Sequence, residues 1–456
     1  MTTSRRAFLA SAASVAFAAA RRPNIVFILA DDLGWGDLGC HGHPLVKTPV
    51  LDRMAAEGMD FHQFTVASPV CSPSRAAIMT GHFPARYSIH QHFATHQQNA
   101  ERGMPDWLDP RAPTLPRILK QAGYRTGHFG KWHLTNLDAI PAAPPPRSYG
   151  YDESLLWNGP CPCAVGDITE PGDHAEQFAA FGTTAVVSAA IRFIKSAGTT
   201  PFFINLWIHE THVPVGATPE DRQPYTDVQE PQQTYYAAVT RADREVGRVL
   251  DALKEWKLDQ DTLVIFTSDN GPETSSRDPK AGTYYSVGST GGLKGRKRSL
   301  LMGGVCTPFL VRWPGTVPAG RVDRTIPLSA VDMLPSLCAA AGCALPNGYR
   351  PDGENILPAL KGQPFERNKP IFWEWRGNHG GDNWPTFGVR EGAFGLVANE
   401  AGTRTELYDL IADRSQKNNL AVERAAQAAS MLGKIHEWKR TLPAQPSACC
   451  IMKTPG

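Results

Sequence analysis

The 456-residue sequence lacks several features that would assign a protein to a class at once. No hydrophobic run reaches the length of about 20 residues that a membrane-spanning helix needs, so we expect no stable membrane anchor. Basic and acidic residues nearly balance, at 46 against 44. This balance gives no strong field that would attract nucleic acid. Internal repeats and long low-complexity tracts are absent as well, so we expect a globular chain.

The cysteines do not form the C-x-x-C pairs that are typical of zinc sites. They number nine, which is odd, so at least one thiol of an exported chain stays unpaired or is modified. No N-x-S/T acceptor for glycosylation occurs anywhere in the sequence. That absence favours a bacterial over an animal lysosomal origin.

The N-terminal segment has the pattern of an export signal. Arg5 and Arg6 precede an apolar, alanine-rich run over residues 7–20, which ends in small residues at a plausible cleavage site. The stretch SRRAFL resembles a twin-arginine signal of bacteria, although a eukaryotic secretory signal would look much the same. We therefore expect residues 1–22 to be removed and the mature protein to be periplasmic or secreted.

Alternating helices and apolar strands predict the fold. Continuous apolar runs such as residues 25–30 are typical of strands buried on both faces, and residues 59–68 also have the composition of one strand. Helix signals alternate with them, for example over residues 114–122. The pattern predicts a large, mostly parallel sheet between two layers of helices over residues 23–347. Short strands with turn signals, followed by a helix, predict a smaller C-terminal subdomain over residues 348–456.

Four of the expected strands end on polar or charged side chains. In open parallel sheets, ligands bind beyond the carboxyl ends of the strands. Four polar clusters at the same edge therefore predict one built site rather than four unrelated loops. These clusters are Asp31 with Asp32, Lys131 with His133, His212, and Asp269 with Asn270.

The acidic clusters indicate a metal site. Asp31, Asp32, Asp269 and Asn270 offer only hard oxygen ligands, which suit Ca²⁺ or Mg²⁺ and suit zinc poorly. A single aspartate after a strand is equally well explained as the N-cap of a helix. Two such pairs on matching strand ends favour a metal ion.

Cys71 lies at the expected start of a short helix, in the stretch CSPSRAAIMTG. A soft thiol is a poor neighbour for a hard cation. The free N–H groups and the dipole of a helix N-terminus, in contrast, favour an anion. A side chain carrying oxygen at position 71 would fit both the cation and the helix.

The stretch around Cys71 resembles the C-x-P-S-R signature of the type I sulfatases, which belong to the alkaline-phosphatase-like superfamily. Further blocks resemble that family in its own order along the chain: PNIVFILADDLGWGDLGCHG, GKWHL, FTSDNG and ELYDL. The resemblance implies the alkaline-phosphatase-like α/β fold with a smaller C-terminal antiparallel sheet and helix. It also implies hydrolysis of sulfate monoesters.

In type I sulfatases a dedicated formylglycine-generating enzyme oxidises the signature cysteine to formylglycine. The resemblance therefore implies formylglycine (3-oxoalanine) at Cys71, whose hydrate would attack the sulfur of the ester. A calcium ion would polarise the ester and activate the nucleophile. Its ligands would be Asp31, Asp32, residue 71, Asp269 and Asn270. Asp269 would also accept a proton, and Arg75 would orient the hydrate.

Four more residues match positions at which the family handles sulfate. Lys131, His212 and Lys297 would offset the charge on the ester oxygens. His133 would accept the proton whose removal releases sulfate, a role that a near-neutral pKa suits. Lys297 is preferred to the other cations of the stretch LKGRKRS because the family places its lysine shortly before a Gly-Gly pair, here Gly303 with Gly304.

Two other functions fit parts of the pattern. A phosphate or phosphonate monoester hydrolase of the same fold is one, although zinc phosphatases need nitrogen ligands and a Ser or Thr nucleophile that this chain lacks at the matching places. A non-catalytic sulfoglycan-binding protein, with Cys71 kept as a thiol, is the other. His133 and Arg75 argue against the binder. Export and loops rich in Trp and His, at residues 154–161 and 376–385, are compatible with a sulfated glycan as the substrate.

Overall fold

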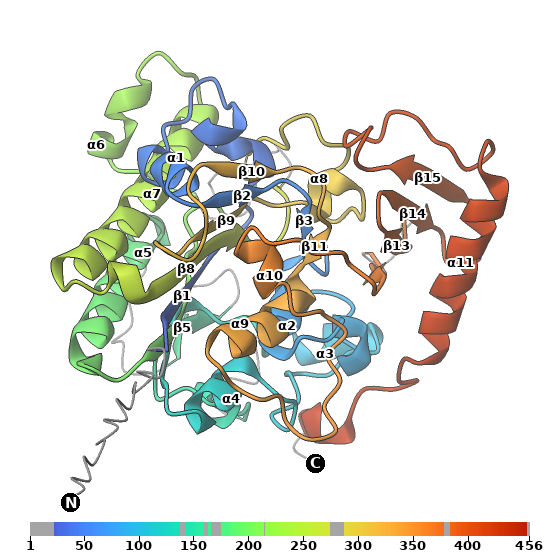
Figure 1. The fold of residues 1–456 in the computed structure, drawn as a ribbon, viewed down its shortest axis with the longest axis horizontal. Coiled ribbons are helices and arrows are strands. Elements are labelled where there is room, and N and C mark those ends of the chain that lie inside the picture. Colours follow the sequence, from blue (N-terminus) through green and yellow to red (C-terminus); the bar gives the residue numbers. More distant parts are fainter. Residues whose placement is uncertain are drawn as a thin grey trace, which may run out of the picture.

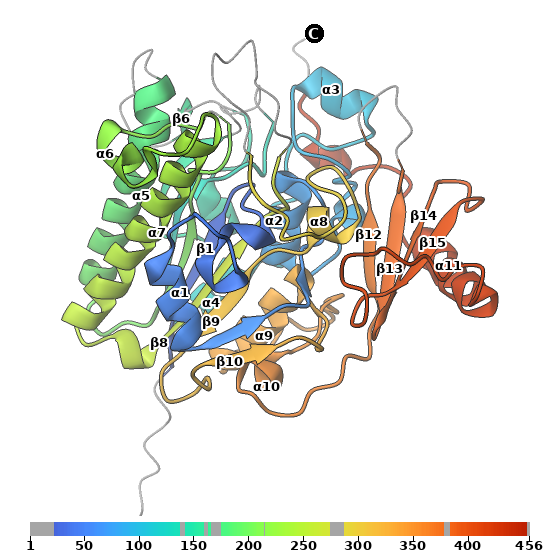
Figure 2. The same ribbon diagram turned by 90° about the horizontal axis from the view of Figure 1, so that it is seen from above.

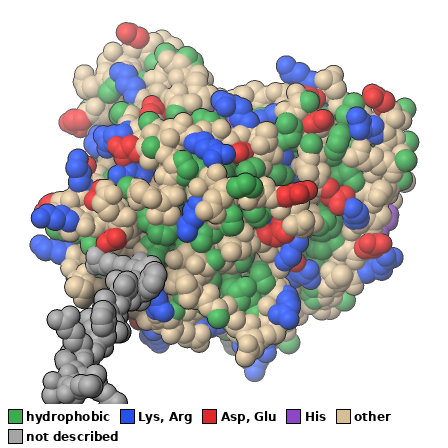
Figure 3. Space-filling view, viewed as in Figure 1, with side chains coloured by type: hydrophobic (Ala, Val, Ile, Leu, Met, Phe, Trp, Pro, Cys, Tyr) green, Lys and Arg blue, Asp and Glu red, His purple; other side chains and the backbone are tan. Residues whose placement is uncertain are grey.

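The computed structural model describes most of the chain after the expected export signal, whose residues 1–21 lie outside it. The described residues are 22–136, 142–158, 163–165, 175–213, 215–273, 287–377 and 384–453. Among them, no helix combines the length and the apolar character that crossing a membrane requires. Basic and acidic side chains are interspersed over the face seen in Figure 3, in keeping with a net charge of +2.

A nine-stranded, mostly parallel sheet forms the centre of the molecule (Figure 1). Its strands are β1 (Asn24–Ala30), β2 (Met59–Phe61), β4 (Arg125–Lys131), β5 (Glu153–Asn158), β6 (Cys163–Val165), β7 (Phe202–Trp207), β8 (Thr262–Ser268), β9 (Phe309–Arg312) and β10 (Arg321–Asp323). They lie in the order β10-β2-β9-β8-β1-β7-β4-β5-β6. The pairings of β2 with β9, β8 with β9 and β5 with β6 are antiparallel, and the other five are parallel. The predicted large, mostly parallel sheet is therefore confirmed.

Strand β1 shows why the sheet is buried on both faces. Successive side chains of a strand point to opposite sides. Phe27 and Leu29 join one hydrophobic cluster, and Val26 and Ile28 join the other. All of them are fully buried, which is the arrangement that the continuous apolar run predicts.

Two layers of helices cover the faces of the sheet (Figures 1 and 2). One face carries α1 (Pro49–Ala56), α5 (Ala175–Ala197) and α7 (Gln232–Glu255). The other carries α2 (Cys71–Thr80), α4 (Leu115–Gln121) and α9 (Met333–Ala340). Helix α1 begins with Pro49 at its first position, where a missing N–H costs nothing.

A separate four-stranded antiparallel sheet lies towards the C-terminus, with one helix packed against it (Figure 2). It consists of β12 (Ile371–Glu374), β13 (Phe387–Glu391), β14 (Phe394–Ala398), β15 (Thr405–Asp409) and the helix α11 (Ala425–Arg440). Trp373 of this sheet donates a hydrogen bond from Nε1 to the backbone oxygen of Val66 at 2.7 Å. The smaller C-terminal sheet was expected, while the boundary at residue 347 stays a prediction.

The expected single strand over residues 59–68 is divided in two. Its first part, β2, lies between β9 and β10, whereas β3 (Phe64–Thr65) pairs with β11 (Leu328–Ser329) in a small sheet of its own. The chain thus changes from one sheet to the other at residues 62–63. The remaining short helices are α3 (His96–Glu101), α6 (Pro219–Arg222), α8 (Met302–Val305) and α10 (Leu357–Leu360).

Replacement of Ile28 tests the position of β1 at the centre of the core. Ile28→Ala deletes buried methyl and methylene groups and should lower the free energy of unfolding by about 2–5 kcal/mol. Leu45→Ala is the matched control, because the side chain of Leu45 is 51% exposed, and it should change stability by less than about 0.5 kcal/mol. Urea denaturation of the two variants measures both values. Equal effects would contradict this placement of β1.

Candidate active site

The carboxyl ends of four neighbouring strands converge on one cluster of polar side chains. Strands β8, β1, β7 and β4 are adjacent and parallel, so their carboxyl ends lie at the same edge of the sheet. The polar residues at these ends are Asp269 and Asn270 after β8, Asp31 and Asp32 after β1, His209 and His212 after β7, and Lys131 and His133 at the end of β4. The structure thus brings together the clusters that the sequence predicted to meet.

Cys71 faces this cluster from the first position of α2. Its side chain is buried, and Lys131 Nζ lies 3.6 Å from Cys71 Sγ. No side chain caps the start of α2, so the backbone N–H groups of its first turn remain available to an anion. Burial raises the pKa of the Cys71 thiol to about 12, against the attraction of Lys131 and Lys297. The thiol is therefore protonated at neutral pH and would be a poor nucleophile.

Each of two lysines forms an ion pair with one aspartate. Lys131 Nζ lies 2.6 Å from Asp31 Oδ2, and Lys297 Nζ lies 2.7 Å from Asp32 Oδ2. Burial by itself would raise the pKa of Asp31, but the Lys131 ammonium and other nearby cations outweigh it and hold the pKa well below its usual range. Burial opposes the charge of Lys297 too, yet Asp32 and its neighbours raise the lysine pKa above its ordinary value. Both shifts favour the charged forms of Asp31 and Lys297.

Arg75, one helical turn after Cys71, binds the third aspartate. Its Nε and Nη2 donate to Asp269 Oδ2 at 3.1 and 2.6 Å, and its Nη1 donates to the backbone oxygen of Lys131 at 3.1 Å. Burial and the charge of Asp31 raise the pKa of Asp269 to about 7, although Arg75 works in the other direction. A carboxyl group with this pKa can take up or release a proton near neutral pH.

The oxygens of the cluster fit a hard cation. Asp31 Oδ1 and Asn270 Oδ1 are buried and receive no hydrogen bond, which is costly unless another partner satisfies them. Donor atoms of Asp31, Asp32, Cys71 and His212 lie within 4.8 Å of one another. Asp269 and Asn270, which contact Asp32, add further carboxylate and amide oxygens to this set. Oxygens then predominate over the single thiol and imidazole, so Ca²⁺ or Mg²⁺ suits the cluster better than zinc.

The two histidines named from the sequence lie at the cluster. Burial, reinforced by Lys131, lowers the pKa of His133 well below its ordinary value. The near-neutral pKa expected for His133 therefore does not match the structure, in which the ring is neutral and in the form that accepts a proton. His212 Nε2 lies 3.7 Å from Asp32 Oδ2, and burial lowers the pKa of His212 as well.

Among the cations of the stretch LKGRKRS, Lys297 is the one that reaches the aspartates. Lys294 instead donates to Tyr408 Oη at 2.8 Å, and Arg296 donates to the backbone oxygen of Glu273. The choice of Lys297 rested on its distance from the Gly-Gly pair. The structure places it at the cluster by direct contact with Asp32.

Sequence reasoning gave no role to Thr211 and Glu273, and it predicted that His209 supports the site without reacting. Thr211 donates its hydroxyl to the backbone oxygen of Asp31, and His209 Nδ1 lies 3.0 Å from Asp31 Oδ2. Glu273 Oε2 lies 3.6 Å from Lys297 Nζ. The only available signal for Glu273 was its place three residues after Asn270, which a loop residue without a function would share.

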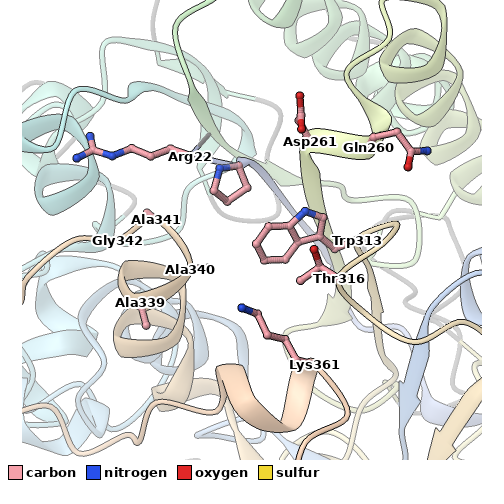
Figure 4. Close-up of a pocket in the computed structure, with 11 residues that line it drawn as sticks. Arg22, Gln260, Asp261, Trp313, Thr316, Ala339, Ala340, Ala341, Gly342 and Lys361 are labelled. Carbon is pink, nitrogen blue, oxygen red and sulfur yellow. The ribbon is translucent and has the colours of Figure 1, made fainter. Parts of the chain in front are cut away.

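A hollow of about 510 Å³ lies away from this cluster (Figure 4). Trp313, Lys361 and Arg22 are among the residues that line it. Arg22 comes just before β1, and Asp31 comes just after it. Seven residues at about 3.3 Å each separate the two ends of the strand by roughly 23 Å. The hollow therefore opens near the amino end of β1 and is not part of the site.

Comparisons with known proteins identify the family. A model of the family described as "Sulfatase" matches residues 23–343, and one described as "N-sulphoglucosamine sulphohydrolase, C-terminal" matches residues 296–440. The chain belongs to the sulfatase family. It is therefore a sulfuric ester hydrolase with the alkaline-phosphatase-like fold.

Individual sulfatases align with most of the chain. N-acetylgalactosamine-6-sulfatase of Canis lupus familiaris is 36% identical over 398 residues, which cover 81% of this chain and 72% of that protein. Arylsulfatase A of Homo sapiens is 33% identical over 414 residues, which cover 82% of this chain and 74% of that protein.

Solved structures agree with this assignment. The crystal structure of Ps i-CgsB in complex with k-i-k-neocarrahexaose has a TM-score of 0.77 and 26% identity, and it covers 94% of this chain and 96% of its own. The phosphonate monoester hydrolase of Agrobacterium radiobacter has a TM-score of 0.64 at 22% identity, over 92% of this chain and 95% of its own. That similarity shows a common fold alone.

Lys297 and Lys294 provide a matched test of the cluster in this sulfatase. We expect Lys297→Ala to lower kcat/KM on an aryl sulfate by about 10²–10³, the effect of removing one preorganised group that stabilises developing charge. Lys294→Ala should leave the rate within about twofold, since its ammonium contacts Tyr408 and Glu406. Steady-state kinetics of both variants provides the comparison, and similar losses would argue against a special role for Lys297.

Proposed function

We propose that this sulfatase hydrolyses sulfate monoesters on a sulfated glycan, using formylglycine made from Cys71 and a bound calcium ion. The observation that carries the proposal is a buried, protonated thiol whose sulfur lies within 4.8 Å of the carboxylates of Asp31 and Asp32, in a cluster with two unsatisfied oxygens, Asp31 Oδ1 and Asn270 Oδ1. A thiol neither ligates a hard cation well nor attacks sulfur in this state. An aldehyde hydrate at the same position supplies oxygen for both tasks.

The residues of the cluster have the chemistry to hold calcium. The proposed ligands are Asp31, Asp32, residue 71, Asp269 and Asn270. When bound, calcium polarises a sulfate oxygen and favours ionisation of the nucleophilic hydroxyl of residue 71. The buried oxygens without hydrogen bonds, Asp31 Oδ1 and Asn270 Oδ1, support this assignment.

Cations around residue 71 would bind and orient the sulfate group. Lys131 and Lys297 both reach the cluster, and each forms an ion pair with one aspartate. The N-terminus of α2 adds backbone N–H donors for the oxygens. His212 Nδ1 lies 2.7 Å from the backbone oxygen of Val213, so His212 would donate from Nε2 to a sulfate oxygen only in its protonated form. Charge that develops on these oxygens in the transition state is then met by groups already in place, which is the most effective form of electrostatic catalysis.

Two residues would move protons. Asp269 would take the proton of the attacking hydroxyl, and its ion pair with Arg75 holds the carboxylate in position. His133 would accept the second proton, whose removal releases sulfate. Its depressed pKa keeps the ring neutral before the reaction and makes it a weaker base than expected, so this step depends on a close approach of the proton to the ring.

The substrate class rests on the relatives. Canis lupus familiaris N-acetylgalactosamine-6-sulfatase acts, by its name, on a sulfated amino sugar, and Ps i-CgsB was crystallised with a neocarrahexaose. We extend this class to the present chain. The Trp- and His-rich loops that suggested sugar binding lie in part outside the described residues, at 159–161 and 378–383.

The maturation and location of the enzyme follow from the same proposal. Formylglycine at position 71 requires a formylglycine-generating enzyme in the producing cell. The signal pattern of residues 1–22 places the mature enzyme in the periplasm or outside the cell. We also propose the division into a catalytic domain over residues 23–347 and a smaller C-terminal subdomain over residues 348–456.

Mass spectrometry of the peptide that contains residue 71 tests the nucleophile. In protein from the native producer we expect the mass of a formylglycine peptide, together with its hydrate, and reactivity towards an aldehyde-specific hydrazide. Cys71→Ala should lack both the aldehyde and the activity while keeping its stability, since position 71 makes few polar contacts. An unmodified thiol in active enzyme would contradict the proposed nucleophile and would favour a binding protein if activity were absent.

Substrate class is tested by sulfate release from a panel of substrates. Sulfated mono- and polysaccharides should yield free sulfate faster than alkyl sulfates, and aryl phosphates and phosphonates should be poor substrates. Activity on aryl or alkyl sulfates with failure on every glycan would overturn the glycan assignment. Faster cleavage of a phosphonate than of any sulfate would favour a phosphonate monoester hydrolase.

A further inference from the structure

A second cluster of metal-binding side chains lies apart from the carboxylates of the active site. Its members are Cys40, His41, Asp60 and His62. Cys40 and His41 belong to a short 3-10 helix, Gly39–His41. Asp60 lies in β2, which follows helix α1 along the chain. None of the four has a part in the proposed reaction.

The donor atoms of these side chains lie close to the spacing of ligands around one metal ion. His41 Nε2 lies 3.0 Å from Asp60 Oδ2, and His62 Nε2 lies 3.2 Å from the same oxygen. Cys40 joins His41 and Asp60 in a set whose donor atoms are all within 4.8 Å of one another, and His62, which lies outside this set, meets it through its contact with Asp60 Oδ2. Ligands at about 2.0–2.3 Å from a tetrahedral zinc ion lie roughly 3.3–3.8 Å apart. Small movements of these side chains would therefore complete a site.

The hydrogen bond on the other ring nitrogen of His41 fixes what Nε2 can do. His41 Nδ1 lies 2.6 Å from the backbone oxygen of Trp35, so Nδ1 must carry a proton and donate it. A neutral His41 would then direct the lone pair of Nε2 at the carboxylate of Asp60, which is repulsive. Either a second proton or a metal ion must lie between them. Histidines that bind metals commonly donate their other N–H to a backbone oxygen in this way.

An unsatisfied oxygen favours the metal ion. Asp60 Oδ1 is buried and has no hydrogen-bond partner, while the side chains of Asp60 and His41 are 4% and 0% exposed. A second proton on His41 would leave this oxygen unpaired. A metal ion can bind both oxygens of one carboxylate and can use both imidazoles and the thiol together.

We propose that Cys40, His41, Asp60 and His62 form a structural zinc site. The mixture of one thiol, two imidazoles and one carboxylate suits a borderline-soft cation such as Zn²⁺, whereas the oxygen-rich active site suits calcium. Four protein ligands make a closed site, which is typical of structural rather than catalytic zinc.

Zinc at this position would stabilise the segment that follows Asp31 and Asp32. The His41 ring stacks on Trp35 with centroids 4.1 Å apart, and the guanidinium of Arg414, from the C-terminal part of the chain, lies 3.9 Å from the Trp35 ring centroid. A metal ion that links His41 to β2 would hold the Trp35 ring in place between His41 and Arg414. The site thus contributes to the rigidity of the catalytic edge without contact with substrate.

Zinc content of the purified full-length protein tests the site directly. The protein is incubated with Zn²⁺ in an excess of Ca²⁺, which occupies the active site, then gel-filtered and analysed by elemental mass spectrometry. The wild type should retain about one zinc ion per chain. His41→Gln and His62→Gln should each lose at least about tenfold in zinc affinity. His436→Gln is the matched control, because His436 is exposed, and it should keep the wild-type zinc content.

Cobalt substitution gives a second measurement that does not depend on the folding of the histidine variants. Co²⁺ bound to the wild type should show a thiolate-to-cobalt charge-transfer band, and Cys40→Ser should lose that band. The proposal is overturned if the wild type retains no more zinc than the double variant His41→Gln/His62→Gln, or if bound Co²⁺ shows no thiolate band. The first result would mean that His41 carries two protons and forms an ion pair with Asp60.

Discussion

Mutual repulsion of three buried aspartates is the constraint around which this sulfatase is built. Asp31, Asp32 and Asp269 are 0% exposed at one edge of the sheet, where like charges cannot persist without compensation. Each has at least one cation in direct contact, and Asp31 has two, Lys131 and Arg75. Breaking such a pair on one side leaves an uncompensated buried charge, a loss of about 3–5 kcal/mol. The positions of the cations are therefore as tightly set as those of the carboxylates.

The fold meets this constraint by bringing distant segments to one place. The aspartates follow β1 and β8, two parallel strands that are paired in register along their whole length. Lys131 ends β4, and Arg75 reaches Asp269 from α2 on one face of the sheet. The proposed nucleophile at position 71 then lies at a helix N-terminus that faces the same charges. Catalysis follows from this arrangement because the groups that bind sulfate need no rearrangement when charge develops.

Much of this arrangement could be predicted from the sequence, because each strand ends on its functional residues. The apolar run of β1 predicts the strand, and the Asp31–Asp32 pair directly after it predicts the site at the end of that strand. The resemblance to the sulfatase family identified Lys297, which composition alone does not distinguish from its basic neighbours. Contacts that depend on loop conformation could not be predicted, as with Glu273. Nor could the low pKa of His133, since it arises from burial by segments far apart in sequence.

The division of residues 59–68 between β2 and β3 shows a similar limit, because a change of sheet leaves no mark in an apolar sequence.

The central claim, that the crowded oxygens hold a hard cation, is tested most directly by a crystal structure of the mature enzyme grown with Ca²⁺. The account predicts one calcium ion at about 2.3–2.6 Å from oxygens of Asp31, Asp32, Asp269 and Asn270. Saturating calcium with no ion there, and with Lys131 and Lys297 still paired to Asp31 and Asp32, would contradict it.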